Sequence, residues 1–359
     1  MKILQINKFD QLKGGSEQYI FSISALLKDQ GHEVELFSMD RPEKIRPKLF
    51  WNRDANKNLA KVIKKFKPDV AHVHNIYHHF SPSILYTLKK HNVPVVMTLH
   101  DYKIMCPNYR MYNKKSVCEK CQGGKYYKCF SNDCFNDWAR SAGASLESYL
   151  HNSVLGSYER HVKTFISPSK FLMNKFKEWG LEGKIEYLPN TTNITSTSRE
   201  KGDYLLYFGR LEAEKGINFL VDVMRDLPQE KLIIVGKGNI KINNTENIKY
   251  LGFKSGHELK ELVNRAKAVI VPSVWYENNP LNIIEAHALG TWVIGSKIGG
   301  IPELIKEEEN GDLVEPGNKK DLIKKINNLK NKDINIKSQK IITPENHLKK
   351  LLDIYEQAI

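Results

Sequence analysis

Two glutamates eight residues apart are the first candidates for chemistry. Glu277 and Glu285 lie in the stretch W-Y-E-N-N-P-L-N-I-I-E-A-H-A-L-G, which follows an apolar segment. With Glu277 in a loop and Glu285 in the first turn of the next helix, both carboxylates face one pocket. There they can accept hydrogen bonds from the vicinal hydroxyls of a sugar or a ribose. A second interpretation stays open: Glu277 is solvated and Glu285 merely favours a helix N-terminus.

Positive charge is placed upstream of these carboxylates. Arg210 and Lys215 flank a loop between an apolar segment and a helical pattern. Two fixed cations and the free N–H groups of a helix N-terminus suit a diphosphate. In the first half of the chain, Gly14 and Gly15 hold the corresponding place, and glycines let a backbone approach phosphates closely.

Both halves of the chain begin with the same pattern of elements, an apolar strand, a glycine turn, a helix and a second strand. We expect these elements at Lys2–Asn7, Glu17–Gln30 and Val34–Phe37, and again at Tyr204–Phe208, Ile217–Asp226 and Lys231–Val235. Further apolar runs, typical of parallel strands buried on both faces, are Val70–His74, Val95–Leu99, Ala268–Pro272 and Trp292–Gly295. The pattern predicts an α/β protein with two doubly wound, Rossmann-like domains. Ligands of such sheets meet the carboxyl ends of the strands, so a cleft between the domains is the expected site.

Domain boundaries follow from composition. The stretch 191–202 is polar, without periodicity and rich in Thr and Ser, which is typical of a linker. We therefore predict an N-terminal domain at 1–195 with a Cys-rich insertion at about 104–136, a C-terminal domain at 196–342 and a closing helix at 343–359. One large domain fits the length of 359 residues less well.

The motifs together resemble one enzyme family. The Glu-x7-Glu motif, with Gly-Arg and Lys-Gly upstream, is similar to that of retaining glycosyltransferases of family 4, which have the GT-B architecture and use nucleotide-sugar donors. Matching residues span nearly the whole chain: Gly14-Gly15-Ser-Glu17, His72-Val-His74-Asn75, Thr98-Leu-His100-Asp101, Ser167-Pro-Ser169, Gly209-Arg210, Lys215-Gly216, Val235-Gly-Lys-Gly238 and Gly299-Gly-Ile-Pro-Glu303. The resemblance implies two domains facing across a cleft, with the C-terminal helix crossing back to the N-terminal domain.

The resemblance also implies roles for single residues. Arg210 and Lys215 would hold the donor diphosphate and stabilise the departing nucleotide. Glu277 would bind the transferred sugar, and His100 would bond to a sugar hydroxyl or a leaving-group oxygen. The remaining donor contacts would come from the Gly14-Gly15 backbone, Gly236 near the base, the Pro280-Leu281 backbone against the phosphates, and Glu285 on the ribose.

Two features bear on the reaction. Many relatives have glycine where this chain has Pro280, which lacks an N–H to donate. No Asp-x-Asp occurs, so the metal-binding signature of the other major glycosyltransferase fold is missing, and the two cations make a catalytic metal unnecessary. The resemblance implies retaining transfer without a protein nucleophile.

All five cysteines fall between residues 106 and 134. The spacing Cys118-x2-Cys121-x7-Cys129-x4-Cys134 is compatible with a structural four-thiolate zinc site. Free thiols are the other interpretation. His72 and His74 alternate on an expected strand beside His78 and His79, and hydrogen bonding or packing describes them better than a metal cluster, because no acidic ligand accompanies them.

The charge distribution is uneven. The chain carries a net charge of +14, and about +12 of this belongs to residues 1–200. Segment 41–67 combines basic residues with Phe50 and Trp51, which suits an anionic membrane interface, although a solvated helix face explains it equally well. Nucleic acid is not an expected partner, because no binding motif accompanies the charge. A hydrophobic content of 41% and a charged content of 27% exclude a disordered chain. The chain shows no secretory leader or spanning segment, so we expect a cytoplasmic protein that is peripheral to the inner face of the cell membrane.

We therefore predict a metal-independent hexosyltransferase that moves a sugar from a UDP- or GDP-type donor to a lipid-linked or oligosaccharide acceptor in bacterial surface glycan synthesis. Two alternatives are open. One is a nucleotide-sugar 2-epimerase of similar fold, although its acid–base carboxylates cannot be located. The other is a non-enzymatic membrane- or nucleic-acid-binding protein, against which the set Arg210, Lys215, Glu277 and Glu285 argues.

Overall fold

The computed structural model describes residues 1–12, 14–39, 50–77, 80–114, 116–194, 200–331, 336 and 341–359. Its contacts divide the chain into two units. Unit 1 comprises Met1–Met111, Cys118–Pro189 and Pro344–Ile359, and unit 2 comprises Tyr112–Val117 and Asn190–Thr343. The expected boundary at residues 195 and 196 lies outside the described residues.

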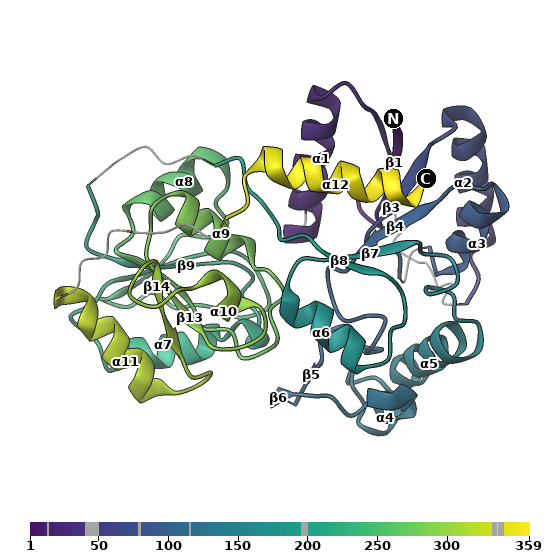
Figure 1. The fold of residues 1–359 in the computed structure, drawn as a ribbon. Helices are drawn as coiled ribbons and strands as arrows, with labels where there is room; N and C mark the ends of the chain where they lie inside the picture. The colour runs from purple at the N-terminus through teal and green to yellow at the C-terminus, as the bar shows by residue number, and fades with distance from the viewer. Residues whose placement is uncertain are drawn as a thin grey trace. The chain divides into compact units, whose positions relative to one another are not determined.

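Unit 1 is built on a six-stranded parallel sheet in the order β2-β1-β3-β4-β7-β8. Its strands are β1 (Lys2–Ile6), β2 (Glu33–Phe37), β3 (Val70–Val73), β4 (Val95–Thr98), β7 (Thr164–Ser167) and β8 (Ile185–Tyr187). Its helices are α1 (Gly15–Asp29), α2 (Arg53–Phe66), α3 (Ser83–Lys90), η1 (Gln122–Gly124), α4 (Tyr127–Ser131), α5 (Trp138–Ser148), the π-helix η2 (Tyr149–Val154), α6 (Lys170–Glu178) and the C-terminal α12 (Pro344–Ala358). Helix α12 packs against α1 and β4, as Figure 1 shows.

Unit 2 has a second six-stranded parallel sheet, in the order β11-β10-β9-β12-β13-β14. Its strands are β9 (Leu205–Phe208), β10 (Leu232–Val235), β11 (Ile248–Tyr250), β12 (Ala268–Val271), β13 (Val293–Ser296) and β14 (Gly311–Val314). Its helices are η3 (Ala213–Lys215), α7 (Ile217–Arg225), α8 (Gly256–Arg265), α9 (Leu281–Ala288), α10 (Ile301–Leu304), α11 (Lys319–Asn328) and η4 (Leu329–Asn331). A short antiparallel pair, β5 (Tyr112–Asn113) and β6 (Ser116–Val117), also belongs to this unit.

Both sheets therefore have the doubly wound architecture that the sequence predicts. Strand order reverses once in each sheet, between β1 and β3 in unit 1 and between β9 and β12 in unit 2. Ligands of open α/β sheets bind outside the carboxyl ends of the strands at such a reversal. Of the expected site residues, Gly14 and Gly15 follow β1, Arg210 and Lys215 follow β9, and Glu277 follows β12, while His100 and Gly236 follow the neighbouring strands β4 and β10.

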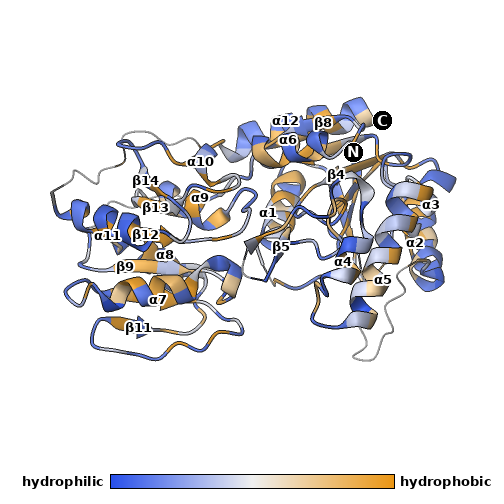
Figure 2. Cartoon of the chain, turned by 90° about the horizontal axis from the view of Figure 1, so that it is seen from below, coloured by the Kyte–Doolittle hydropathy of each residue, from blue (hydrophilic) through white to orange (hydrophobic). Residues whose placement is uncertain are grey.

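Burial of apolar faces explains why the helices lie on the sheets. Helix α7 buries Ile217, Leu220, Val223 and Met224, which share one face, against the strands of unit 2. Figure 2 shows α7 coloured largely hydrophobic and α11 largely hydrophilic. No helix in the described ranges is long and apolar enough to span a bilayer.

Candidate functional site

The cationic loop of unit 2 follows β9, at the reversal of strand order. Arg210 comes two residues after the strand, and its side chain is 48% exposed, 3.6 Å from the buried Glu214 carboxylate. Lys215 ends the turn η3, and Gly216 starts α7 with a φ of 73°. A Cβ on Gly216 would lie 1.8 Å from the Pro272 carbonyl oxygen, so only glycine lets this loop approach the end of β12.

Glu277 lies in the loop after β12 and is held by three donors. Its Oε1 accepts hydrogen bonds from Lys215 Nζ at 2.6 Å, Ser273 Oγ at 2.6 Å and Trp275 Nε1 at 2.9 Å. Burial acts to raise the pKa of the Glu277 carboxyl, but Lys215 and the other donors outweigh burial and keep this pKa below its ordinary value. The carboxylate is therefore ionised, and its Oε2 lies outside these three bonds.

The backbone of Glu277 is fixed as well. Gly300 N–H donates to the Glu277 carbonyl oxygen at 2.7 Å. Gly299 has a φ of 60°, and a Cβ there would lie 2.3 Å from the same oxygen. The Gly-Gly pair after β13 thus lets a second loop close onto the Glu277 loop.

Glu285 is buried, with 6% exposure, but its expected position in the helix is wrong. Helix α9 begins at Leu281, so Glu285 lies in the second turn and not in the first. Pro280 is the N-cap with φ −68°, and its carbonyl accepts from Ile283 N–H. Pro280 has no N–H to donate, so the first helical N–H group at this end is that of Leu281. Elsewhere in unit 2, Gly236 follows β10 and donates its N–H to the Gly252 carbonyl.

In unit 1, the expected glycines lie at the start of α1. Gly14 is the N-cap, with extended backbone that any residue can adopt, and Gly15 is the first helical residue. The nearby Glu17 is buried and accepts hydrogen bonds from Asn7 Nδ2 at 3.2 Å and Ser16 Oγ at 3.1 Å. The Gly15 N–H thus opens a helix at the carboxyl end of β1.

His100 follows β4 and belongs to a chain of hydrogen bonds. Its Nε2 lies 2.9 Å from His74 Nδ1, and His74 Nε2 lies 2.7 Å from Gln5 Oε1. With the Gln5 oxygen as acceptor, His74 donates from Nε2 and accepts from His100 at Nδ1. This leaves His100 Nδ1 as an acceptor. Burial, and then the positive charge of Lys8, lower the pKa of His100 to about 3, so the imidazole is neutral.

Sequence reasoning missed the contribution of the C-terminal helix to this network. Tyr355 in α12 has its hydroxyl 2.6 Å from His72 Nδ1, while His72 Nε2 lies 2.7 Å from Thr98 Oγ1. His347, also in α12, lies 3.1 Å from the Tyr19 hydroxyl through its Nε2. The apolar pattern of residues 347–359 predicted the helix, but no local signal identifies its polar partners. His78 and His79 lie outside the described residues.

The five cysteines of the insertion are buried or half-buried thiols with no disulfide among them. Cys121 and Cys129 are buried with Tyr126, and Cys134 packs against them. Across the described ranges, no group of three or more His, Cys, Asp or Glu side chains is arranged to hold a metal ion. Burial raises the pKa of Cys121, and a hydrogen bond with Cys129 raises that of Cys134. The zinc site at Cys118, Cys121, Cys129 and Cys134 stays a prediction that elemental analysis can test.

The described part of the basic segment forms an amphipathic helix. Helix α2 buries Ala55, Leu59 and Ile63 and exposes a row of basic side chains, Arg53, Lys57, Lys61, Lys64 and Lys65. Trp51, before the helix, is 50% exposed. Residues 41–49 of the segment lie outside the described residues.

Comparisons with known proteins show the family of the chain. A family model described as Glycosyltransferase Family 4 matches residues 13–196, and one described as Glycosyl transferases group 1 matches residues 191–345. The chain belongs to glycosyltransferase family 4. An uncharacterized glycosyltransferase of Methanocaldococcus jannaschii is 28% identical over 347 residues, which cover 86% of this chain and 83% of the relative.

Two further proteins are similar to this glycosyltransferase. The lipopolysaccharide 1,2-N-acetylglucosaminetransferase of Salmonella typhimurium is 26% identical over 222 residues, covering 52% of this chain and 58% of that enzyme. HepE of Anabaena, solved in complex with UDP and glucose, superposes with a TM-score of 0.70 at 18% identity and covers 99% of both chains. Structural neighbours of this kind, with the two parallel sheets, show the GT-B fold.

Proposed function

We propose that this glycosyltransferase is a retaining enzyme that moves a hexose from a UDP- or GDP-type sugar to a hydroxyl of a lipid-linked or oligosaccharide acceptor in surface glycan synthesis. One observation carries the donor assignment. At the strand-order reversal of unit 2, the loop after β9 bears Arg210 and Lys215, and the loop after β12 bears an ionised Glu277 hydrogen-bonded to Lys215. The UDP in the HepE complex supports a nucleotide at such a site.

Each side chain has a task that fits its surroundings. The half-exposed Arg210 is more accessible to a diphosphate than Lys215, and Lys215 shares its charge between Glu277 and the leaving phosphate. Charge that develops on the departing nucleotide is then stabilised by groups already in place, which is the largest catalytic effect available to such a site. These cations can take the place of a catalytic metal.

In this proposal, side chains that accept hydrogen bonds recognise the sugar and the ribose. Glu277 Oε2 would accept from a hydroxyl of the transferred sugar, and the buried Glu285 would accept from the ribose. His100 Nδ1 would take a sugar hydroxyl as a neutral acceptor. The Gly15 and Leu281 N–H groups, each at a helix start, would face phosphate oxygens, and Gly236 would lie near the base.

Nucleotide binding tests the donor assignment. UDP and GDP should each be added to the wild type and to Arg210→Ala, and the melting temperature measured. We expect one nucleotide to stabilise the wild type by several degrees and the variant much less. Arg225→Ala, which removes an exposed arginine of the same unit, should leave the nucleotide effect intact. A wild type that neither nucleotide stabilises would contradict the proposal. Conversion of a UDP-sugar to its epimer without acceptor would indicate an epimerase instead.

We propose that the basic face of α2 attracts an anionic lipid surface. Its basic side chains project from one exposed helix face, and Trp51 at the start of the helix suits the interface. Co-sedimentation with vesicles that contain phosphatidylglycerol should fall when Lys57, Lys61 and Lys64 are changed to Glu. Binding that ignores the anionic lipid content would contradict this proposal.

A further inference from the structure

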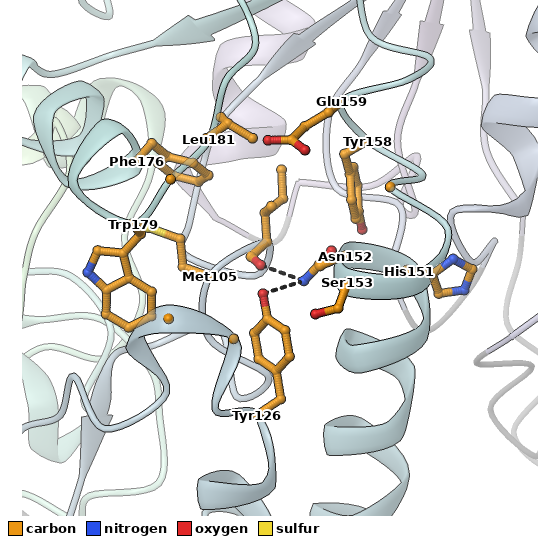
Figure 3. Close-up of a pocket in the computed structure, with 15 residues that line it drawn as sticks. Met105, Tyr126, His151, Asn152, Ser153, Tyr158, Glu159, Phe176, Trp179 and Leu181 are labelled. Atoms are coloured by element: carbon orange, nitrogen blue, oxygen red, sulfur yellow. Dashed lines mark hydrogen bonds between the residues drawn. The ribbon is translucent and has the colours of Figure 1, made fainter.

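A cavity of about 300 Å³ lies in unit 1, and none of the residues given a catalytic or donor-binding role lines it. Its walls come from the segment after His100, from the turn η1, from the π-helix η2 and from the end of α6. In Figure 3, Met105, Phe176, Trp179 and Leu181 lie on one side, and Asn152, Ser153, Tyr158 and Glu159 lie on the other. The cavity thus has an apolar, aromatic wall opposite a polar one.

Two buried polar atoms in these walls lack a hydrogen bond within the described structure. Asn152 Nδ2 donates to the Ile104 carbonyl at 2.6 Å and to the Tyr126 hydroxyl at 3.2 Å, which fixes the amide orientation. Asn152 Oδ1 is left as a buried acceptor with no partner, and Trp179 Nε1 is a buried donor with none. Such atoms are costly unless something supplies the missing bonds. In Figure 3 the Trp179 nitrogen points away from the polar wall, so Asn152 Oδ1 is the atom that a donor hydroxyl in the cavity can satisfy.

The backbone that supplies Asn152 is itself unusual. Asn152 lies in the π-helix Tyr149–Val154, directly after α5. Single π-helical turns are rare and frequently occur at functional sites. Here the π-turn brings Asn152 into the wall, where its amide joins η2 to the segment after His100 through the Ile104 carbonyl.

The charge of the lining selects the class of ligand. Among the described residues that line the cavity, Glu159 is the one carboxylate, and no lysine or arginine is present. A phosphate or a nucleotide would therefore meet no cation. Aromatic and aliphatic surface opposite neutral amide, hydroxyl and phenol groups fits a neutral polyhydroxyl compound, whose C–H faces are apolar and whose rim is polar.

We propose that this cavity binds one saccharide unit of a carbohydrate substrate, stacked on Trp179 and hydrogen-bonded to Asn152. Its position favours the acceptor side, because Ile104 and Tyr158 also line a small neighbouring cavity that contains His100 and Asp101. The saccharide in the cavity is then a recognition unit beside the reacting one. This proposal rests on the proposed glycosyltransferase reaction for its biological meaning, but the binding itself can be measured alone.

Saturation-transfer NMR with methyl α-glucoside, methyl α-galactoside and N-acetylglucosamine as probes tests the site. We expect the wild type to transfer saturation to at least one probe. Trp179→Ala, which removes the stacking wall, should weaken that binding at least about tenfold. Ser153→Phe should abolish it, because the new ring fills the cavity from an exposed position. Trp138→Ala is the matched control, because Trp138 is a 56% exposed tryptophan of the same unit outside the cavity.

Each possible result leads to a different conclusion about the cavity. Absence of transfer to all three probes, or transfer that Trp179→Ala and Ser153→Phe leave unchanged, would overturn the site. Transfer to choline in place of the sugars would assign the aromatic wall and Glu159 to an organic cation instead. Melting curves with the nucleotide, UDP or GDP, that stabilises the wild type serve as the second readout: the cavity variants should keep the wild-type nucleotide shift, which shows that they are folded. A wild type that neither nucleotide stabilises would count against the donor proposal and leave the cavity result standing.

Discussion

Removing the Lys215 ammonium should lower the stability of the protein, because it leaves the buried Glu277 carboxylate without its cation. Lys215 Nζ and Glu277 Oε1 are 2.6 Å apart, and their side chains are 20% and 6% exposed. Breaking a buried ion pair from one side costs about 3 to 5 kcal/mol. Ser273 and Trp275 keep their bonds to Oε1, and Lys215 is partly solvated. We therefore expect Lys215→Met to lower the free energy of unfolding by about 2 to 3 kcal/mol, in the range of one hydrogen bond to a charged group.

Urea denaturation of a double-mutant cycle measures this pair. The wild type, Lys215→Met, Glu277→Gln and the double variant should give a coupling free energy of about 2 kcal/mol near pH 8. Lys231→Met is the control, because its ion pair with Asp203 is mostly exposed, with side-chain exposures of 69% and 80%, and should leave stability unchanged.

The pH dependence of the free energy of unfolding gives a second test of this ion pair. In the wild type the pKa of Glu277 is lowered, so its contribution to stability is present above the unfolded value of 4.5 and is lost as the pH falls through the lower folded value. In Lys215→Met, burial without the cation raises this pKa above the unfolded value. Protonation of Glu277 then removes the cost of burying its unpaired charge. The loss in free energy of unfolding relative to the wild type should therefore shrink as the pH falls from about 8 to about 5. Additive single effects, or a deficit that stays constant with pH, would refute the pairing.

Three further predictions follow from single contacts. His100→Ala should lower kcat for sugar transfer at least about tenfold, and the wild-type pH–rate profile should show no ionisation of His100 between about pH 5 and about pH 8, because its pKa of about 3 keeps the ring neutral there. Gly216→Ala should lower the free energy of unfolding by more than about 2 kcal/mol, since its Cβ meets a carbonyl oxygen, whereas Gly317→Ala, with the similar φ of 72° in open space, should cost only about 1 kcal/mol in urea denaturation. Glu147→Ala removes the carboxylate that lies 2.9 Å from the buried Lys103 ammonium, and it should lower the free energy of unfolding by about 3 to 5 kcal/mol. A decrease in melting temperature of less than about 2 °C would contradict the buried ion pair.

Most strands buried on both faces were predictable and most edge strands were not. The exceptions are the edge strand β2, which was expected, and the buried inner strand β7, which was not. Strands β1, β4, β9 and β12 begin and end within one or two residues of their expected positions, because each is a short apolar run ended by polar or glycine residues. β8 (Ile185–Tyr187) is an edge strand with half-buried side chains, and its three residues carry no apolar run. An edge strand is specified by its neighbour's hydrogen bonds more than by its own composition.

The residue types at the site were also easier to predict from the sequence than the contacts between them. The types and spacing of Arg210, Lys215 and Glu277 predicted a polar site at strand ends, but the Lys215–Glu277 hydrogen bond joins residues 62 apart in sequence. The error at Glu285 had a signal that was available. Proline is tolerated at a helix start, so Pro280 marks the beginning of α9 and places a glutamate five residues later in its second turn.

The electrostatics of the candidate residues differ between unit 1 and unit 2. In unit 2, Lys215 lowers the pKa of the Glu277 carboxyl, so this carboxylate is ionised despite its burial. In unit 1, burial and the Lys8 charge keep His100 neutral, and the His74–Gln5 chain orients it as an acceptor. A protonated His100 could only donate hydrogen bonds. A neutral imidazole can accept one from a hydroxyl, so the lowered pKa of His100 fits the sugar contact proposed for it.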